Sequence, residues 1–166
     1  MAEPILDPTY WRRRLLQARH GGCIHHAIFK HPLDSWRRIE ERHRHILAKH
    51  VGPCQSVLDA GCGWGRLLTL MPPTWRGVYV GVDISPDFIA MAEEQHPDRS
   101  FLCADLRTWQ KSGPLIFDWA VMISMRPMIK RNLGDVEWGI IEGNVRRVAA
   151  KILYLEYDER DEGGVE

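Results

Sequence analysis

The stretch VLDAGCGWGR, residues 57–66, joins a short apolar run to three glycines spaced two residues apart. The apolar run is typical of a buried strand, and Gly61, Gly63 and Gly65 come directly after it. Glycine has no Cβ, so it adopts left-handed conformations and lets the backbone approach a ligand closely. In parallel α/β sheets, ligands bind where the strands reach their carboxyl ends. The stretch therefore predicts a strand that leads into a ligand-binding turn.

The chain that follows alternates between strand patterns and helix patterns. Strands that are almost continuously apolar and alternate with helices are typical of a parallel sheet covered on both faces. We therefore predict an α/β fold that is doubly wound around a mainly parallel sheet. The predicted strands lie at 56–60, 77–83, 100–105, 117–124 and 151–157, and the predicted helices between them at 63–71, 86–95 and 135–149.

Two further helices are predicted before the first strand, at 9–19 and 35–50. The second carries apolar residues on one face and ends at Gly52-Pro53, a pair that terminates helices. No shift in composition marks a domain boundary. We therefore expect a single domain, residues 1–166, in which 1–54 form an N-terminal helical cap or lid, 55–157 form the core and 158–166 form an acidic tail.

Composition narrows the class of protein only in part. The 22 Lys and Arg balance 22 Asp and Glu, but the first fifty residues hold ten basic residues against five acidic ones, so an anionic partner for that part stays open. Four cysteines form no CxxC pair, which indicates neither a zinc knuckle nor a redox site. There is no signal peptide and no run long enough to span a bilayer. We expect a soluble, cytoplasmic protein without a bound metal.

The glycine turn departs from the two common nucleotide-binding patterns. A G-x-G-x-x-G fingerprint counted from Gly61 needs glycine where Arg66 stands, and counted from Gly63 it needs glycine where Leu68 stands. The phosphate loop G-x-x-x-x-G-K-[ST] is absent as well. Asp59 precedes the first glycine by two residues. A carboxylate at that point opposes a pyrophosphate and suits a ligand with a cationic amine.

Four segments in order resemble the class I S-adenosylmethionine-dependent methyltransferases. VLDAGCGWGR resembles the glycine loop of the family's first motif, and GVDISPDFIAMA (81–92) resembles its second strand with the acid and helix that follow. FLCADLRTW (101–109) and FDWAVMIS (117–124) resemble the third motif and the fourth strand. The resemblance covers about residues 55–157. It implies S-adenosylmethionine as the cofactor and the strand order 3-2-1-4-5.

The resemblance also implies a role for individual residues. Asp83, twenty residues after Gly63, would accept hydrogen bonds from both ribose hydroxyls, and Ile84 would pack against the adenine. Asp105, with the Leu106 backbone, would receive the adenine amino group. The remaining implied cofactor residues are Asp59 near the methionine ammonium, Gly61, Cys62, Gly63 and Gly65 in the glycine loop, and Ser124 and Met125 beside the sulfonium and the path of the methyl group.

These motifs do not specify the methyl acceptor. SMRPM, residues 124–128, stands in place of the [DNS]-P-P-[YFW] motif of enzymes that methylate base amino groups, which argues against that activity. A small molecule or a protein side chain is the expected acceptor. A partner subunit that binds S-adenosylmethionine without turnover and a nucleic-acid methyltransferase stay open as alternatives. Candidate lid and acceptor residues are Tyr10, Trp11, His25, His26 and Arg126, and the histidines have three open interpretations, as a base, as metal ligands with Cys23 or as ordinary surface residues.

The family's usual sheet has seven strands, of which the last two form a hairpin beside strand five. This chain ends soon after the predicted fifth strand, so the resemblance implies a sheet without that hairpin. Strand five would then be an open apolar edge, which invites pairing with another strand. We expect an N-terminal segment, a second copy of the chain or a partner subunit to cover it.

Overall fold

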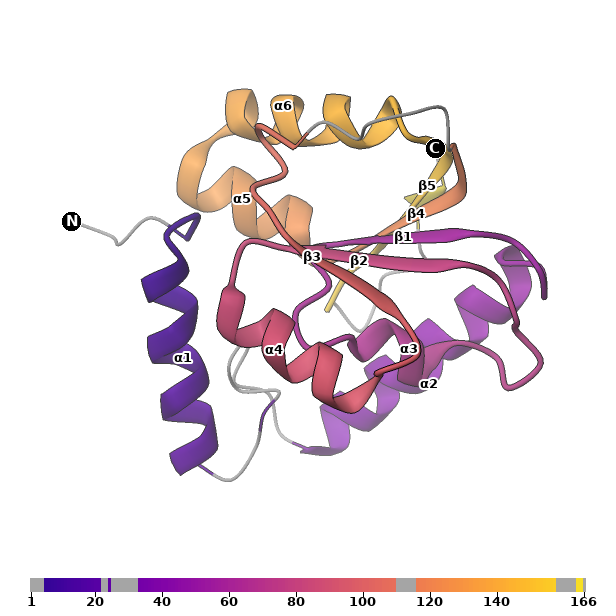
Figure 1. The fold of residues 1–166 in the computed structure, drawn as a ribbon, viewed down its shortest axis with the longest axis horizontal. Coiled ribbons are helices and arrows are strands. Elements are labelled where there is room, and N and C mark those ends of the chain that lie inside the picture. The colour runs from indigo at the N-terminus through magenta and orange to yellow at the C-terminus, as the bar shows by residue number, and fades with distance from the viewer. Residues whose placement is uncertain (1–4, 22–23, 25–32, 110–115, 158–163, 166) are drawn as a thin grey trace.

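The sheet confirms the predicted fold class. The computed structural model describes residues 5–21, 24, 33–109, 116–157 and 164–165, and among these the strands form one sheet in the order β3-β2-β1-β4-β5-β6 (Figure 1). The first five strands are parallel, so the order 3-2-1-4-5 is confirmed. The strands are β1 (Val57–Ala60), β2 (Tyr79–Asp83), β3 (Ser100–Cys103), β4 (Phe117–Ile123), β5 (Ala149–Leu155) and β6 (Gly164–Val165).

Helices cover both faces of this sheet. In Figure 1, α5 and α6 lie above the sheet, α2, α3 and α4 lie below it, and α1 stands beside α4. The α/β fold is therefore doubly wound, with helices on both sides of the strands. The helices are α1 (Pro8–His20), α2 (Leu33–His50), α3 (Arg66–Leu70), α4 (Pro86–Gln95), α5 (Met125–Leu133) and α6 (Asp135–Arg146).

Capping residues explain where two of these helices begin. The Asp7 side chain accepts a backbone N–H of the first turn of α1, and Pro8 occupies the first helical position. Ser85 caps α4 in the same way, and Pro86 opens that helix. Such side chains satisfy donors that have no partner within the helix, while proline has no N–H to leave unpaired. The predicted start of α4 at Ser85-Pro86 is confirmed.

Alternation along β1 separates two core clusters. Leu58 and Ala60 belong to the cluster that contains the buried residues of α5 and α6, whereas Val57 belongs to the cluster with α2 and α3. Tyr79 of β2 lies in the same cluster as Val57, and its hydroxyl donates a hydrogen bond to Asp59. Successive residues of a strand point to opposite faces. Asp59 therefore projects with Val57, away from α5 and α6.

The helix α5 was not predicted from the sequence. It follows Ser124 and ends at Gly134, and Pro127 lies in its first turn, where the missing N–H costs no helical hydrogen bond. Its apolar residues Met125, Met128 and Ile129 recur at helical spacing, but nine residues that include a proline are few for a helix to be recognised from such a pattern. It nevertheless brings Met125 and Ile129 into the core beside the end of β4.

The outer edge of β5 pairs with a further strand, so the prediction of an open edge is wrong at two positions. Gly164 and Val165 form β6, which pairs antiparallel with Tyr154 and Leu153. These residues come from the stretch that we expected to be an acidic tail. At these two positions the covering strand comes from the chain itself, and cover of the rest of the edge by a second copy or a partner subunit stays a prediction. Backbone donors and acceptors of β5 are satisfied there within the fold.

The described cysteines, Cys54, Cys62 and Cys103, are free thiols. Within the ranges that the structure describes, no three His, Cys, Asp or Glu side chains gather into a group that could hold a metal ion. In those same ranges, no helix combines the length and the apolar character needed to cross a membrane.

Candidate functional site

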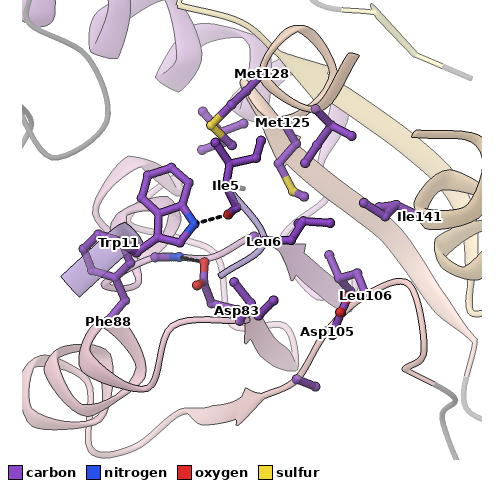
Figure 2. Close-up of a pocket in the computed structure, with 16 residues that line it drawn as sticks. Ile5, Leu6, Trp11, Asp83, Phe88, Asp105, Leu106, Met125, Met128 and Ile141 are labelled. Atoms are coloured by element: carbon purple, nitrogen blue, oxygen red, sulfur yellow. Dashed lines mark hydrogen bonds between the residues drawn. The ribbon is translucent and has the colours of Figure 1, made fainter. Parts of the chain in front are cut away.

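A pocket lies where β1, β2 and β4 end and meet the helices above them (Figure 2). About 680 Å³ of space lies within it, part of which is open solvent at its mouth. Its position is that of the ligand site in doubly wound sheets. Six of the residues predicted to bind the cofactor line it, namely Gly61, Gly63, Asp83, Ile84, Asp105 and Leu106.

The glycine turn forms one wall of this pocket. Gly61, Gly63 and Gly65 have positive φ angles of 77°, 52° and 79°, which other residues adopt only with strain. A Cβ on Gly61 would lie 2.3 Å from the Met125 sulfur, so no side chain fits at that position without moving Met125. A Cβ on Gly63 would meet no atom within 4 Å, although Gly63 itself is buried. The space beside Gly63 is therefore the pocket, and the turn is a cradle that a side chain would fill.

Asp83 joins the glycine turn to the start of α4. Its Oδ2 accepts a hydrogen bond from the Gly63 N–H at 2.9 Å, and its Oδ1 accepts one from the Ser85 N–H at 2.8 Å. Burial raises the pKa of the Asp83 carboxyl above its ordinary value, and the backbone donors oppose that rise. A carboxylate has about four lone-pair sites, so both oxygens retain capacity to accept hydrogen bonds from a ligand.

The end of β3 supplies a second acid, which is held in place by an arginine. The Arg107 Nε donates to both oxygens of Asp105, at 3.1 and 2.9 Å. Burial alone would raise the pKa of Asp105, but the hydrogen bonds and charge of Arg107 hold it below its ordinary value. The Leu106 carbonyl accepts a hydrogen bond from the Asn144 side chain at 2.9 Å. Ile84 and Leu106 thus form an apolar surface beside the Asp105 carboxylate, which Arg107 holds in place.

The opposite side of the pocket is apolar. Met125, Met128 and Ile129 of α5, together with Ile141 of α6, line it, and we call these four residues the helix wall. Sequence reasoning missed Met128, Ile129 and Ile141, because their place depends on a helix that the patterns did not predict and on the packing of α6 against it. No Lys, Arg or His is found among the described residues that line the pocket.

The N-terminal segment lines a third side of the pocket. Ile5 and Leu6 project into it, and Ile5 lies between Trp11 and Met125 in the view of Figure 2. Only 2% of Ile5 is exposed, and its carbonyl accepts a hydrogen bond from the Trp11 indole at 2.7 Å. Trp11 itself lines the pocket, and its role as a lid stays a prediction. Its neighbour Tyr10 packs against the core without lining the pocket.

Three predicted cofactor residues near the turn lie outside the pocket lining. Asp59 is 1% exposed and accepts a hydrogen bond from the Tyr79 hydroxyl at 2.8 Å, on the face of the sheet that α2 and α3 cover. Cys62 packs in the same core cluster as Tyr79. A Cβ on Gly65 would lie 2.8 Å from the His96 ring. Asp59 and Cys62 therefore support the turn from the side that faces away from the pocket.

Ser124 also lies next to the pocket without lining it. Its φ of 53° is left-handed, which is uncommon for a residue other than glycine. Its hydroxyl accepts a hydrogen bond from the Tyr157 N–H at 2.9 Å, and its own N–H donates to the Leu155 carbonyl at 2.7 Å. The bend at Ser124 turns the chain from β4 into α5 and thereby brings Met125 against the glycine turn.

The remaining candidate acceptor residues are not brought together by the described structure. Arg126 lies outside the pocket lining, with its guanidinium 4.8 Å from the centre of the Tyr154 ring and its Nε 3.9 Å from the Glu156 carboxylate. His25 and His26 fall outside the described residues, so their role stays a prediction.

A buried charged cluster supports the glycine turn from the other face of the sheet. Arg66 follows the turn directly and has a side chain that is 5% exposed, with its Nε 3.3 Å from the Glu40 carboxylate. It also donates a hydrogen bond to the Tyr157 hydroxyl, and its Nη2 lies 3.5 Å from the His43 Nδ1. The cluster ties α2 and the end of β5 to the residue after Gly65. Sequence analysis identified Arg66 only as a departure from a dinucleotide fingerprint.

Asp59 predicts a pH dependence of stability. Burial raises its pKa from 3.8 to about 7, with the Tyr79 hydrogen bond opposing the rise, the Asp83 charge adding to it and the Arg66 charge opposing it. The folded state therefore binds a proton more tightly than the unfolded state, and this residue lowers stability as pH rises from about 4 to 7. Asp59→Asn should stabilise the protein by about 2 kcal/mol more at pH 8 than at pH 5. Urea unfolding of both proteins measures this, and an equal effect at the two pH values would contradict it.

Comparison with known proteins agrees with this geometry. The chain matches the family described as a methyltransferase domain over residues 57–134. It is 39% identical over 83 residues to a trans-aconitate 2-methyltransferase from Azoarcus sp. (strain BH72), covering 48% of this chain and 33% of that protein. The chain covers about a third or less of the length of the curated relatives it matches.

Solved structures share the fold. The PH0226 protein from Pyrococcus horikoshii OT3 is similar with a TM-score of 0.59 and 26% identity, covering 72% of this chain and 57% of that one. Phosphoethanolamine N-methyltransferase 1 from Haemonchus contortus, solved with phosphoethanolamine and S-adenosylhomocysteine, gives a TM-score of 0.64 at 17% identity, covering 93% of this chain and 33% of that one. At that identity the second similarity establishes the fold alone.

Proposed function

We propose that this chain is a class I S-adenosylmethionine-dependent methyltransferase, which transfers a methyl group from S-adenosylmethionine to a small-molecule acceptor. The observation that carries the proposal is the cradle beside Gly63, which opens into the same pocket as the Asp83 carboxylate. A nucleoside with an amino-acid tail needs both features, because its tail requires close approach of the backbone and its ribose hydroxyls require an acceptor.

The lining residues fit this cofactor. Asp83 would accept the ribose hydroxyls, Asp105 would accept the adenine amino group, and Ile84 would pack against the adenine ring. The methionine part would lie along Gly61 and Gly63. When bound, S-adenosylmethionine supplies a methyl group on a positively charged sulfur, which passes to a lone pair of the acceptor while the C–S electron pair returns to sulfur.

The chain's own contribution is alignment and the exclusion of water. The helix wall and the side chains of Ile5 and Leu6 surround the space on the far side of Gly63 with apolar atoms. The titratable groups among the described lining residues are Asp83 and Asp105, which backbone N–H groups and Arg107 already engage. We therefore assign positioning to the described residues and leave the role of general base unassigned to any of them.

The charges that line the pocket indicate which class of small molecule can be the acceptor. The Azoarcus relative is named for the methylation of trans-aconitate, which is a polycarboxylate. Burying carboxylates without cationic partners is costly. The described lining offers no Lys, Arg or His to pair with them. These observations favour an acceptor other than trans-aconitate.

Replacing Asp83 by asparagine tests the cofactor site. An amide exchanges one acceptor oxygen for a donor, so either the ribose or a backbone N–H of the turn loses its partner. We expect S-adenosylhomocysteine to bind about 10 to 100-fold more weakly in isothermal titration calorimetry. Asp87→Asn is the matched control, because Asp87 lies in the first turn of α4, 3.9 Å from Arg12, and outside the pocket lining. Equal affinities of the two variants would remove Asp83 from the site.

Product release separates the proposed enzyme from its alternatives. Pools of small molecules, peptides and nucleic acids are incubated with the protein and S-adenosylmethionine, and the formation of S-adenosylhomocysteine is measured. Methyl transfer predicts release that depends on a small-molecule pool. Cofactor binding without release in any pool would favour the non-catalytic partner subunit, and release with nucleic acid alone would favour the third alternative.

A further inference from the structure

We propose that the acceptor is an uncharged small molecule with an apolar body, which lies against the helix wall of Met125, Met128, Ile129 and Ile141. This inference rests on the proposed methyl transfer and names the chemical class of the second substrate. Three observations support it, namely the lining of that side of the pocket, the charges around it and the side chains that now project into it.

The first observation is the lining. Two methionines and two isoleucines form the helix wall, and Ile5 and Leu6 face them from the N-terminal segment. Methionine is flexible and polarizable, so a wall with two methionines adapts to flat or irregular apolar surfaces. An acceptor with an apolar body gains the free energy of removing that surface from water. A carboxylate or phosphate placed there loses its hydration without a replacement partner.

The second observation is the distribution of charge. The charged side chains among the described lining residues are Asp83 and Asp105, and neither offers a positive charge to a nearby anion. Arg107 is held by Asp105, to which it donates from Nε and Nη2. Arg126 follows Met125 in the chain, but its guanidinium lies over the Tyr154 ring, outside the lining. No described cation is therefore in place to bind an anionic acceptor.

The third observation is that the chain itself places aliphatic groups in this space. Ile5 is 2% exposed, and the hydrogen bond from the Trp11 indole to its carbonyl keeps it beside the helix wall. The pocket thus already buries branched aliphatic side chains with no polar partner. An acceptor that shares or takes this space meets the same surroundings.

Two probes that share one ring system, one neutral and one anionic, test the inference. At about pH 7, 2-naphthol is neutral, because phenols have pKa values near 10, while 2-naphthoate is ionised, because carboxyls have pKa values near 4. The protein is labelled with ¹³C at the methionine methyls, of which the chain has six. Met125→Leu and Met128→Leu assign the two signals from the helix wall. Each probe is titrated into protein saturated with S-adenosylhomocysteine, whose own binding is measured first.

We expect the Met125 and Met128 methyl signals to shift with 2-naphthol at a concentration at least about tenfold lower than with 2-naphthoate. Met128→Lys adds a cation to the helix wall and should reduce that preference by about tenfold or more. Met91→Lys is the matched control. Met91 is a half-buried methionine of α4 that packs against the core outside the pocket lining, so this exchange should leave the preference unchanged.

Each contrary result has a distinct meaning. Failure of S-adenosylhomocysteine to bind overturns the proposed function and this inference together. The inference is wrong, and the proposed function stands, if S-adenosylhomocysteine binds but 2-naphthoate binds as tightly as 2-naphthol or more tightly. The same holds if S-adenosylhomocysteine binds but neither probe shifts the Met125 and Met128 signals. An unchanged preference in Met128→Lys also overturns the inference, because the probes would then bind elsewhere.

Discussion

Replacing Arg66 by methionine is expected to lower the free energy of unfolding by about 3 kcal/mol, because it removes one partner of a buried ion pair. The Arg66 side chain is 5% exposed, and its Nε lies 3.3 Å from the Glu40 carboxylate, which is itself 19% exposed. Methionine fills part of the volume but provides no donor for the carboxylate or for the Tyr157 hydroxyl. The Tyr157 hydroxyl would lose this donor inside the core, and the Glu40 carboxylate would lose its buried partner. Urea unfolding of the two proteins measures the difference.

The same carboxylate provides the matched control. Arg44 lies 3.7 Å from the other oxygen of Glu40 and has a side chain that is 48% exposed. Exposed ion pairs contribute about 0–1 kcal/mol, since water screens them. Arg44→Met should therefore lower the free energy of unfolding by an amount near the bottom of that range. If the two variants lose equal stability, the buried cluster does not support the glycine turn.

Replacing Gly63 by alanine is expected to weaken the binding of S-adenosylhomocysteine by at least about 100-fold. The added Cβ would project into the cradle, next to the N–H that Asp83 accepts. The free protein loses little packing, because no atom lies within 4 Å of that Cβ. Its φ of 52° costs an alanine about 1–2 kcal/mol of stability. Calorimetry gives the affinity, and thermal unfolding gives the stability.

Gly134→Ala separates strain from obstruction. Gly134 has a φ of 97°, and a Cβ there also meets no atom within 4 Å, but the residue lies between α5 and α6 outside the pocket lining. Alanine is strained in that conformation as well. We expect Gly134→Ala to lose at least as much stability as Gly63→Ala and to keep its affinity. Equal losses of affinity would mean that strain, and not an obstructed cradle, weakens binding.

Local patterns together with the resemblance to the methyltransferase family predicted the half of the pocket that we assign to the cofactor. Gly63 and Asp83 are twenty residues apart, and each carries a local signal, a glycine-rich turn after one strand and an acid at the end of the next. Parallel pairing of β1 with β2 brings their ends together, so the predicted order places both residues in one pocket. The 2.9 Å hydrogen bond between them follows from that topology.

The other half depended on packing that no local pattern reports. Met128 and Ile141 reach the pocket because α5 and α6 pack above the ends of the strands, and the short helix α5 was not predicted. The β6 pairing joins residues far from any strand pattern. Asp59 is different, because the alternation of β1 already puts it on the face of Val57. That alternation turns Asp59 away from α5 and α6, and its carboxylate accepts a hydrogen bond from Tyr79.

A crystal structure of the protein with S-adenosylhomocysteine tests the central claim most directly. The account predicts a nucleoside between Ile84 and the glycine turn, with its ribose hydroxyls donating to the Asp83 carboxylate and its amino-acid tail passing over Gly63. A nucleoside bound elsewhere, or a ribose that makes no hydrogen bond to Asp83, would contradict it.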